Sequence, residues 1–403
     1  MAVGAPSVFP LAPIDGIRVG ITSAGVRKIG RRDLVVFELA EGSSVAATFT
    51  TNAFCAAPVT IAKQHLATGN GVRFLLINTG NANAGTGEPG MQAAMQCCRA
   101  LATQVGCSVE QVLPFSTGVI GELLPAERVI AALPSVLSDL DPNNWEGAAH
   151  GIMTTDTRPK GATRSLMING KTIRISGISK GSGMIKPNMA TMLGFLATDA
   201  AIAQDDLQAM LSRSVHRSFN SITVDGDTST NDACIAVATG LSGVVIDSLS
   251  RDAFENALRE VCEELAQAIV RDGEGATKFV SVRVSSAQDE GEARRVAYAV
   301  AESPLVKTAL FASDPNWGRI LAAVGRAGVQ HLDVEGVTVT LNGTVIATRG
   351  AVDPGYTEEA GQAAMAPEDI VIDICLGRGS AEATIWTTDL SYDYVKINAD
   401  YRT

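Results

Sequence analysis

The stretch Ser165-Leu-Met-Ile-Asn-Gly-Lys-Thr-Ile-Arg-Ile175 decides the fold, because it contains two β-rich runs joined by a two-residue turn. Asn-Gly is typical of a type I′ turn, in which both central residues have a positive φ, and such turns connect antiparallel strands. A second pair, Asn342-Gly343, lies between Val337-Thr-Val-Thr-Leu and Thr344-Val-Ile-Ala. The sequence therefore predicts antiparallel hairpins at both places.

Further β-rich runs alternate with helical patterns along the chain. The β-rich runs are Phe74–Asn78, Lys278–Val284 and Asp369–Leu376. Apolar residues that recur every three or four positions predict amphipathic helices at Asp205–Phe219, Asp252–Val270 and Ala287–Ala301. Helices mixed with hairpins favour a layered α/β sandwich with mixed or antiparallel sheets over a doubly wound parallel sheet.

Length and composition narrow the class of protein. At 403 residues the chain is long enough for two or three units, since a domain typically has about 100 to 200 residues. The net charge of −11 argues against nucleic-acid binding, which relies on clustered Lys and Arg. Residues 1–20 lack the pattern of a secretory signal, and no apolar run reaches the roughly 20 residues of a membrane span. We expect a cytoplasmic protein that acts on a small molecule.

The sequence gives little support to a histidine-based hydrolase or zinc site, to a P-loop or to a calcium loop. None of the four histidines lies in a Gly-x-Ser-x-Gly or His-x-x-x-His pattern. The glycine-rich loop Asn78–Gly87 lacks the lysine of a P-loop, which favours a structural turn or a loop that shapes a substrate site. The acidic cluster Asp225–Asp232 lacks the glycine and glutamate positions of a calcium loop, and Asp and Ser/Thr turns explain its composition. We expect neither a metal nor a cofactor.

The segment Lys180-Gly-Ser-Gly-Met-Ile-Lys-Pro-Asn-Met-Ala-Thr-Met-Leu-Gly-Phe195 combines several requirements of self-cleavage. Its glycines and proline permit an unusual backbone path. The small side chain of Ala190 leaves its carbonyl open to the hydroxyl of Thr191, whose attack would give an ester that water hydrolyses. A buried threonine that begins an apolar strand is the alternative.

Cleavage at this bond would also activate a hydroxyl without histidine. The freed α-amine of Thr191 would have an ordinary pKa of about 7.7 to 8.0, so it can act as the general base for its own side chain. A threonine paired with its N-terminal amine is an established nucleophile.

The same segment resembles the ornithine acetyltransferase family of arginine biosynthesis, also called glutamate N-acetyltransferases, whose members cut themselves before the threonine of an Ala-Thr-Met-Leu sequence. The similarity extends over essentially the whole chain. Other matching stretches are Phe115–Gly121, Ile152–Asp156, Asp272–Lys278, Ser303–Ala309, Ser313–Arg319 and Ile397–Thr403. So many matches in order make the resemblance specific.

The resemblance implies transfer of acetyl from N2-acetylornithine to glutamate, which gives ornithine and N-acetylglutamate without coenzyme A in this step. Thr191 would carry the acetyl group between the two half-reactions. Some members also make N-acetylglutamate from acetyl-coenzyme A and glutamate, and no motif decides whether this chain does. The family fold is an α/β sandwich like that of self-processing aminopeptidases. The expected assembly has two α chains, residues 1–190, and two β chains, residues 191–403.

Matching the family motifs position by position assigns the site residues. Thr117, through its hydroxyl, and Gly118, through its backbone N–H, would hold the oxyanion. The residues expected to line the substrate site are Thr154, Lys180, Thr191, Glu274, Asn398 and Thr403, and the cleavage site is Ala190–Thr191. Lys180 suits an α-carboxylate, and Glu274 suits an amine and assists proton transfer.

Two other functions fit the residues taken alone. A self-processing amidohydrolase or aminopeptidase would pass the acyl group to water instead of glutamate. A non-enzymatic ligand-binding protein would keep its chain intact, with Thr191 merely packed.

Overall fold

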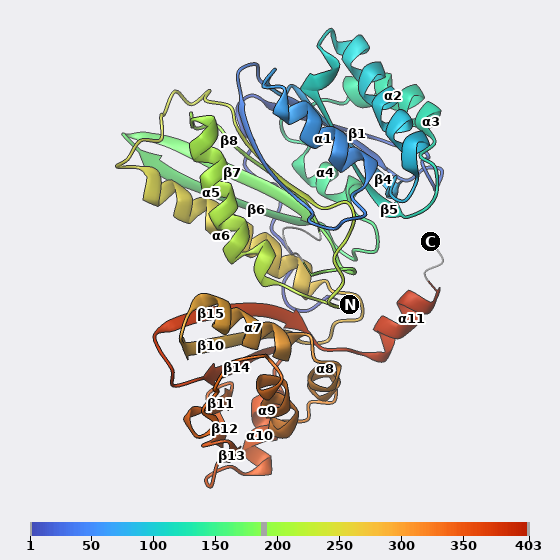
Figure 1. Ribbon diagram of the computed structural model, residues 1–403. Coiled ribbons are helices and arrows are strands. Elements are labelled where there is room, and N and C mark those ends of the chain that lie inside the picture. Colours follow the sequence, from blue (N-terminus) through green and yellow to red (C-terminus); the bar gives the residue numbers. More distant parts are fainter. Residues whose placement is uncertain (1, 187–191, 401–403) are drawn as a thin grey trace. The chain divides into compact units, whose positions relative to one another are not determined.

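The computed structural model describes residues 2–186 and 192–400, and these divide into two compact units. Within these ranges, the N-terminal unit comprises residues 6–220 and 227–269. The C-terminal unit comprises the remaining described residues, at 2–5, 221–226 and from 270 onward. Figure 1 labels the helices and strands of both units.

The N-terminal unit contains two mixed sheets. The four-stranded sheet has the order β1-β2-β4-β5, in which only β4 and β5 are parallel. Its strands are β1 (Ile17–Thr22), β2 (Leu34–Leu39), β4 (Phe74–Asn81) and β5 (Val112–Val119). The five-stranded sheet has the order β3-β9-β8-β7-β6, in which only β8 and β9 are parallel. Its strands are β3 (Ser44–Phe49), β6 (Lys160–Ile168), β7 (Lys171–Lys180), β8 (Leu193–Thr198) and β9 (Ala233–Ala238).

The hairpin predicted around Asn169-Gly170 is confirmed as β6 and β7. Ile168 pairs with Lys171, and the register continues to the far end of both strands. Asn169 and Gly170 have φ values of 51° and 75°, both positive as a type I′ turn requires. A slip of one residue would turn the apolar side chains of β7 to the opposite face, so this turn fixes the position of Lys180 at the strand's end.

The two sheets pack face to face over a shared apolar core. The Phe37 ring of β2 stacks on the Phe195 ring of β8, with centroids 5.5 Å apart. The Phe115 ring of β5 meets the same Phe195 ring edge-on at 5.3 Å. Stacked and edge-on contacts are the favoured arrangements of aromatic pairs. Because these rings come from both sheets, they join the sheets at the centre of the unit.

Helices cover the outer faces of both sheets, which makes this unit a four-layered α/β sandwich (Figure 1). Leu34 of β2 packs outward in a second core with Leu133 of a covering helix. Leu196 of β8 lies near Phe254 of another helix, on the outer side of the five-stranded sheet. The covering helices are α1 (Ala57–Ala67), α2 (Gly87–Val105), α3 (Ala126–Ser138), α5 (Gln204–Arg217) and α6 (Arg251–Arg271). Helix α4 (Trp145–Gly151) instead packs into the core between the sheets, where the Trp145 ring meets the Phe37 ring edge-on. Short 3₁₀ turns lie at Val109–Gln111 and Phe219–Ser221. The predicted sandwich and the predicted helices at α5 and α6 are confirmed.

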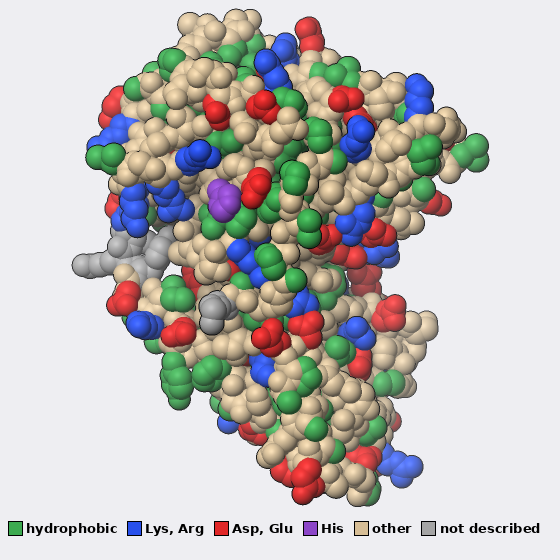
Figure 2. Space-filling model, turned by 180° about the vertical axis from the view of Figure 1, so that it is seen from behind, with side chains coloured by type: hydrophobic (Ala, Val, Ile, Leu, Met, Phe, Trp, Pro, Cys, Tyr) green, Lys and Arg blue, Asp and Glu red, His purple; other side chains and the backbone are tan. Residues whose placement is uncertain are grey.

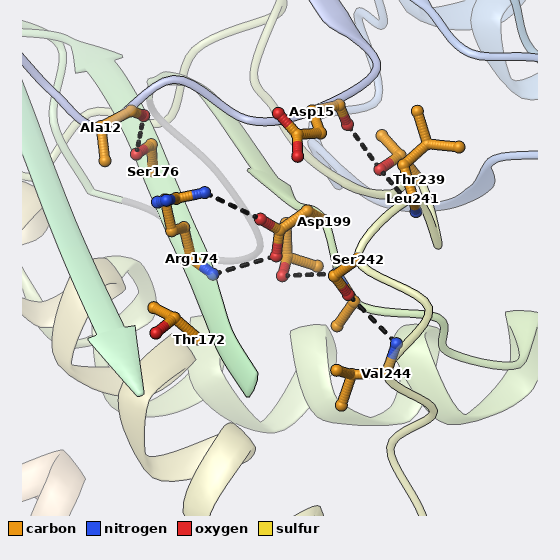
Figure 3. A network of polar contacts seen from close by, with 12 residues as sticks. Ala12, Asp15, Thr172, Arg174, Ser176, Asp199, Thr239, Leu241, Ser242 and Val244 are labelled. Carbon is orange, nitrogen blue, oxygen red and sulfur yellow. Dashed lines mark hydrogen bonds and ion pairs between the residues drawn. The ribbon is translucent and has the colours of Figure 1, made fainter. Parts of the chain in front are cut away.

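A polar network holds β7 to the C-terminal end of β8 (Figure 3). The Arg174 backbone N–H donates to Asp199 Oδ1 at 3.0 Å, and the Arg174 guanidinium lies 3.5 Å from Asp199 Oδ2. The backbone N–H of Ser242 donates to the Asp199 carbonyl at 2.9 Å. A buried carboxylate needs such partners. The network therefore stabilises the five-stranded sheet at the end where β8 finishes, which is opposite to the end where β8 starts.

The C-terminal unit is a six-stranded sheet of order β13-β12-β11-β14-β10-β15, with one parallel pair, β10 and β14. Its strands are β10 (Phe279–Ala287), β11 (Thr338–Leu341), β12 (Thr344–Thr348), β13 (Ala351–Val352), β14 (Asp369–Cys375) and β15 (Ala381–Thr388). Its helices are α7 (Glu290–Ala301), α8 (Pro304–Phe311), α9 (Trp317–Gly325), α10 (Glu358–Met365) and α11 (Tyr392–Asp400), with a 3₁₀ turn at Val334–Gly336.

The second predicted hairpin is confirmed in this unit. Leu341 pairs with Thr344, and Asn342 and Gly343 have φ values of 44° and 81°. Val296 of α7 and Ile320 of α9 pack into the core of the sheet. In the ranges that the structure describes, no helix combines the length and the apolar character needed to cross a membrane.

Candidate functional site

Thr117 and Gly118 lie at the end of β5, beside the end of β4. Thr117 pairs with Thr79 and Gly118 with Gly80, and the register shifts at the next residue, Asn81. Gly118 has a φ of +133°, and a Cβ at this position would lie 2.4 Å from the Gly80 carbonyl carbon. Only glycine fits such a backbone and such a close contact. A hydroxyl and an adjacent backbone N–H are therefore fixed at one strand end.

The glycine-rich loop after β4 is held by asparagine side chains. Asn78 Nδ2 donates to the Asn81 carbonyl at 2.9 Å. Asn231 Nδ2 donates to the carbonyls of Ala82, at 2.5 Å, and Ser116, at 3.0 Å. Buried amides that satisfy backbone carbonyls rigidify a loop. This favours the predicted structural turn beside the site over a phosphate-binding loop.

Lys180 joins the two sheets at this point. It is the last residue of β7, is only 9% exposed, and donates from Nζ to Thr117 Oγ1 at 3.3 Å. An ammonium group has donors only, so the Thr117 oxygen accepts this bond and its own hydrogen stays available for another acceptor. The structure thus brings together two of the predicted site residues from different sheets.

Asp156 organises the other side of this cluster. Its Oδ1 accepts from Lys160 Nζ and from the Gly181 backbone N–H, each at 2.7 Å. Its Oδ2 accepts from the Thr154 backbone N–H at 2.9 Å. One buried carboxylate thereby ties down the predicted residue Thr154 and the chain directly after Lys180.

The charge state of Asp156 follows from its surroundings. Burial alone would raise the pKa of this carboxyl, but the positive charges of Lys160 and Lys180, with the hydrogen bonds from Lys160 and Thr154, hold the pKa below its usual range. Asp156 is therefore ionised at neutral pH. Sequence reasoning quoted Asp156 only as the end of a matching stretch, and no local signal points to its pair with Lys160, because residues 156–159 form no helix on which a spacing of four would bring side chains together.

A second buried carboxyl, Asp232, has the opposite character. Burial raises its pKa well above the usual range, more than the Ser229 hydroxyl, the Lys180 charge and the Met192 backbone N–H lower it. Its Oδ2 has no hydrogen-bond partner in the described part of the chain. These features favour a neutral carboxyl beside Met192. Sequence reasoning weighed this residue only as one member of an acidic cluster.

Glu274 and Asn398 meet in the C-terminal unit. Asn398, on α11, donates from Nδ2 to Glu274 Oε2 at 2.8 Å and to the Tyr394 carbonyl at 3.0 Å. Gly275 has a φ of +69°, and a Cβ there would lie 2.5 Å from the Tyr394 nitrogen. The loop that carries Glu274 is therefore packed tightly against the start of α11.

The buried Lys307 is connected to the loop that carries Glu274 through the end of β15. Burial lowers the pKa of Lys307 to about 8, although Asp389 and Asp225 act in the opposite direction. Lys307 Nζ donates to Thr387 Oγ1 at 2.9 Å and also to the Thr388 carbonyl. Asp389 in turn accepts from the Thr277 backbone N–H at 2.8 Å. The matching stretches Ser303–Ala309 and Asp272–Lys278 thus form one assembly.

The predicted residues fall into three groups. Thr117, Gly118, Thr154 and Lys180 belong to the N-terminal unit, and Glu274 and Asn398 belong to the C-terminal unit. Ala190, Thr191 and Thr403 lie outside the described residues. Among residues 2–186 and 192–400, no three His, Cys, Asp or Glu side chains gather in a way that could hold a metal ion.

Comparisons with known proteins agree with one another. The sequence model of the ArgJ family matches residues 18–403. The chain is 57% identical over 407 residues to the arginine biosynthesis bifunctional protein ArgJ of Pseudomonas syringae pv. tomato (strain ATCC BAA-871 / DC3000), with 100% of both chains covered. It is equally identical, with the same coverage, to the protein of that name from Pseudomonas fluorescens (strain Pf0-1). The crystal structure of the arginine biosynthesis bifunctional protein ArgJ of Bacillus halodurans is 40% identical, with a TM-score of 0.50, and covers 52% of this chain and 100% of that chain.

The four-layered α/β unit fixes a threonine hydroxyl, a glycine N–H and a lysine at adjoining strand ends. Such an arrangement is suited to acyl transfer. The protein is an acyltransferase. It belongs to the ArgJ family. Membership of this family favours the acyltransferase over the self-processing amidohydrolase.

The buried Asp156–Lys160 pair generates a stability prediction. Asp156→Asn should lower the free energy of unfolding by about 3 to 5 kcal/mol at pH 7, because it leaves a buried lysine without its counter-charge. Since the folded pKa of Asp156 lies below the unfolded value of about 3.9, its contribution is full above that pH and is lost as pH falls towards the folded pKa. Urea unfolding between pH 7 and pH 3 measures both effects.

Glu260→Gln is the matched control. Glu260 accepts from Arg164 in a pair of which both side chains are more than a third exposed, so its loss should cost about 1 kcal/mol or less. Equal losses in the two variants, or an unchanged acid limb in Asp156→Asn, would contradict the assignment.

Proposed function

We propose that the protein cuts its own chain between Ala190 and Thr191 and then uses Thr191 to carry acetyl from N2-acetylornithine to glutamate. The products are ornithine and N-acetylglutamate. One observation carries the proposal: Lys180 contacts Thr117 and also pairs across the sheet with Leu193, the residue two positions after Thr191 in the sequence. The start of β8 is thereby fixed beside a hydroxyl and a glycine N–H that can receive an oxyanion.

In the first half-reaction the α-amine of Thr191 takes the proton of its own hydroxyl as the hydroxyl attacks the acetyl carbonyl. Its ordinary pKa of about 7.7 to 8.0 suits this role at neutral pH. The Thr117 hydroxyl and the Gly118 N–H stabilise the oxyanion, and the contact with Lys180 leaves the Thr117 hydrogen available for it. Ornithine leaves, and the acetyl group remains as an ester on Thr191.

In the second half-reaction the amine of glutamate attacks that ester. Lys180 pairs with the α-carboxylate of the substrate, and Thr154, Asn398 and Thr403 complete the substrate site. Glu274 meets the substrate amine and assists proton transfer. Its hydrogen bond from Asn398 supports this role, because it orients the carboxylate within its unit.

Cleavage gives an α chain of residues 1–190 and a β chain of residues 191–403, and two of each form the cytoplasmic enzyme. The five-stranded sheet supports this division. Its strands β3, β6 and β7 come from the α chain and β8 and β9 from the β chain, and the contacts between β7 and β8 and between β3 and β9 cross the cut. The two chains therefore stay joined by backbone hydrogen bonds after cleavage.

The oxyanion role of Thr117 is tested by substitution. Thr117→Ala should lower kcat/KM by about 10² to 10³, since one oxyanion donor contributes roughly 2.7 to 4 kcal/mol to transition-state stabilisation. Thr117→Ser keeps the hydroxyl and is expected to retain most of the activity. Steady-state kinetics on processed enzyme, with the thermal unfolding midpoint as a check on folding, measures this. An alanine variant as active as the serine variant would remove Thr117 from the mechanism.

The identity of the acceptor is tested by following ornithine release. With N2-acetylornithine alone, wild-type enzyme should release about one ornithine per site and then slow sharply, because acetyl-Thr191 waits for an amine. Added glutamate should restore continuous turnover. Turnover that is equally fast without glutamate would mean that water is the acceptor.

A further inference from the structure

The loop of residues 228–232, which leads into β9, contacts the chain just before residues 187–191. Thr228 and Ile185 form an antiparallel β-bridge. Lys186 is the last described residue before the predicted cut, and its carbonyl accepts from the Thr228 hydroxyl at 3.0 Å. The side of the cut that becomes the α chain is therefore held by this loop through backbone and side-chain contacts.

The other end of the 228–232 loop contacts the chain just after the cut. Met192 is the first described residue there, and its backbone N–H donates to the Asp232 carboxyl. The Met192 carbonyl accepts from the Ala233 backbone N–H at 3.0 Å. One short loop thus contacts both sides of the bond that is expected to break.

The segment after β3 fixes the 228–232 loop in place. The Thr50 backbone N–H donates to the Asp232 carbonyl at 3.0 Å, and Thr50 Oγ1 donates to the Ser229 carbonyl at 2.7 Å. Asn52 Nδ2 donates to the Thr228 carbonyl at 2.9 Å. Because these backbone carbonyls are paired with fixed donors, the loop can hold reacting groups in a defined position.

Asp232 differs from the acidic side chains that give the chain its negative charge. Many of those reach the surface, as Figure 2 shows for one face, whereas Asp232 is 4% exposed. Its Oδ2 has no hydrogen-bond partner within residues 2–186 and 192–400, although buried polar atoms are nearly always paired. Burial raises the pKa of this carboxyl, so it has a proton to give.

This carboxyl lies close to the atom from which the acyl group must leave. The Thr191 nitrogen precedes the Met192 nitrogen in the backbone, so covalent geometry keeps the two atoms within about 4 Å of each other. The Met192 nitrogen is hydrogen-bonded to the Asp232 carboxyl. Asp232 therefore has an open oxygen within reach of the bond to be cut.

We propose that the Asp232 carboxyl transfers the proton in self-cleavage, while the 228–232 loop holds both sides of the Ala190–Thr191 bond. The Thr191 oxygen bonds to the Ala190 carbonyl carbon, and the bond from that carbon to the Thr191 nitrogen breaks. Asp232 gives its proton to the leaving nitrogen and takes the proton of the hydroxyl, so the products are an ester, a free amine and a neutral carboxyl. Water then hydrolyses the ester. The inference rests on the proposed function, because it assigns a residue to the first step.

Asp232→Asn tests the proton transfer. The amide has the size of the neutral carboxyl and still forms hydrogen bonds, but it cannot give up a proton at neutral pH. The chain should therefore fold with a thermal unfolding midpoint close to that of wild type, while cutting slows by about 10² or more. Denaturing electrophoresis of the full chain, sampled over time after cell-free synthesis, measures the rate of cutting.

Asp199→Asn is the matched control. Asp199 is a carboxyl of the same unit that is only 1% exposed, and it lies beyond the opposite end of β8 (Figure 3). This variant should be cut at the wild-type rate, whatever its effect on the unfolding midpoint.

Thr228→Val tests the loop and remains informative if Asp232→Asn does not fold. Valine keeps the shape of threonine but cannot donate to the Lys186 carbonyl. Loss of this one hydrogen bond should slow cutting by about two- to tenfold.

Hydroxylamine identifies the step at which Asp232 acts. It attacks esters, so it speeds the cutting of a chain in which the ester forms and only hydrolysis is slow. Asp232→Asn should stay uncut, because the ester does not form. A folded Asp232→Asn that is cut as fast as the control, or that hydroxylamine cuts, would overturn the proposal. A folded Thr228→Val that is cut at the wild-type rate would do the same.

Failure of the proposed function gives a different result. A wild-type chain that stays intact contradicts self-cleavage itself. A wild-type chain that is cut, alongside an Asp232→Asn chain that is cut equally fast, contradicts this inference alone.

Discussion

The close contact between Gly80 and Gly118 is the constraint on which the site depends. A single Cβ at Gly118 would collide with the Gly80 backbone, so the parallel strands β4 and β5 can end side by side only with glycine at this place. From that contact follow the position of the Gly118 N–H and the path of the glycine-rich loop after β4. One close backbone contact therefore positions both the Thr117 hydroxyl and the Gly118 N–H.

Electrostatic interactions then determine the protonation states of the buried carboxyl groups in the site. Lys180 lies within the influence of two buried carboxyls, one held ionised by its neighbours and one favoured as neutral by burial. Asp156 accepts bonds from the residues on either side of the site, while Asp232 faces the backbone at Met192. Because Asp156 is ionised, the positive charge of Lys180 has a negative partner nearby, although burial favours the neutral form of Asp232.

Local patterns predicted the elements but not their assembly. Asn169-Gly170 and Asn342-Gly343 fixed two hairpins because a type I′ turn depends on two adjacent residues. No local signal relates β3 to β9, although Ser44 pairs with Ala238. The contact of Lys180 with Thr117 was likewise invisible, because it joins two sheets. The residues of the site came from family resemblance, whereas the roles of Asp156 and Asp232 become visible only once the strands are in place.

Intact-mass analysis of wild type and Thr191→Ala, each exposed to N2-acetylornithine without glutamate, tests the acyl-threonine chemistry most directly. Wild type should appear as two chains that meet between Ala190 and Thr191, with one acetyl group on the C-terminal chain. Thr191→Ala should remain a single chain without acetyl. A wild-type protein that is active as one uncut chain, or that carries the acetyl group on another residue, would contradict the mechanism.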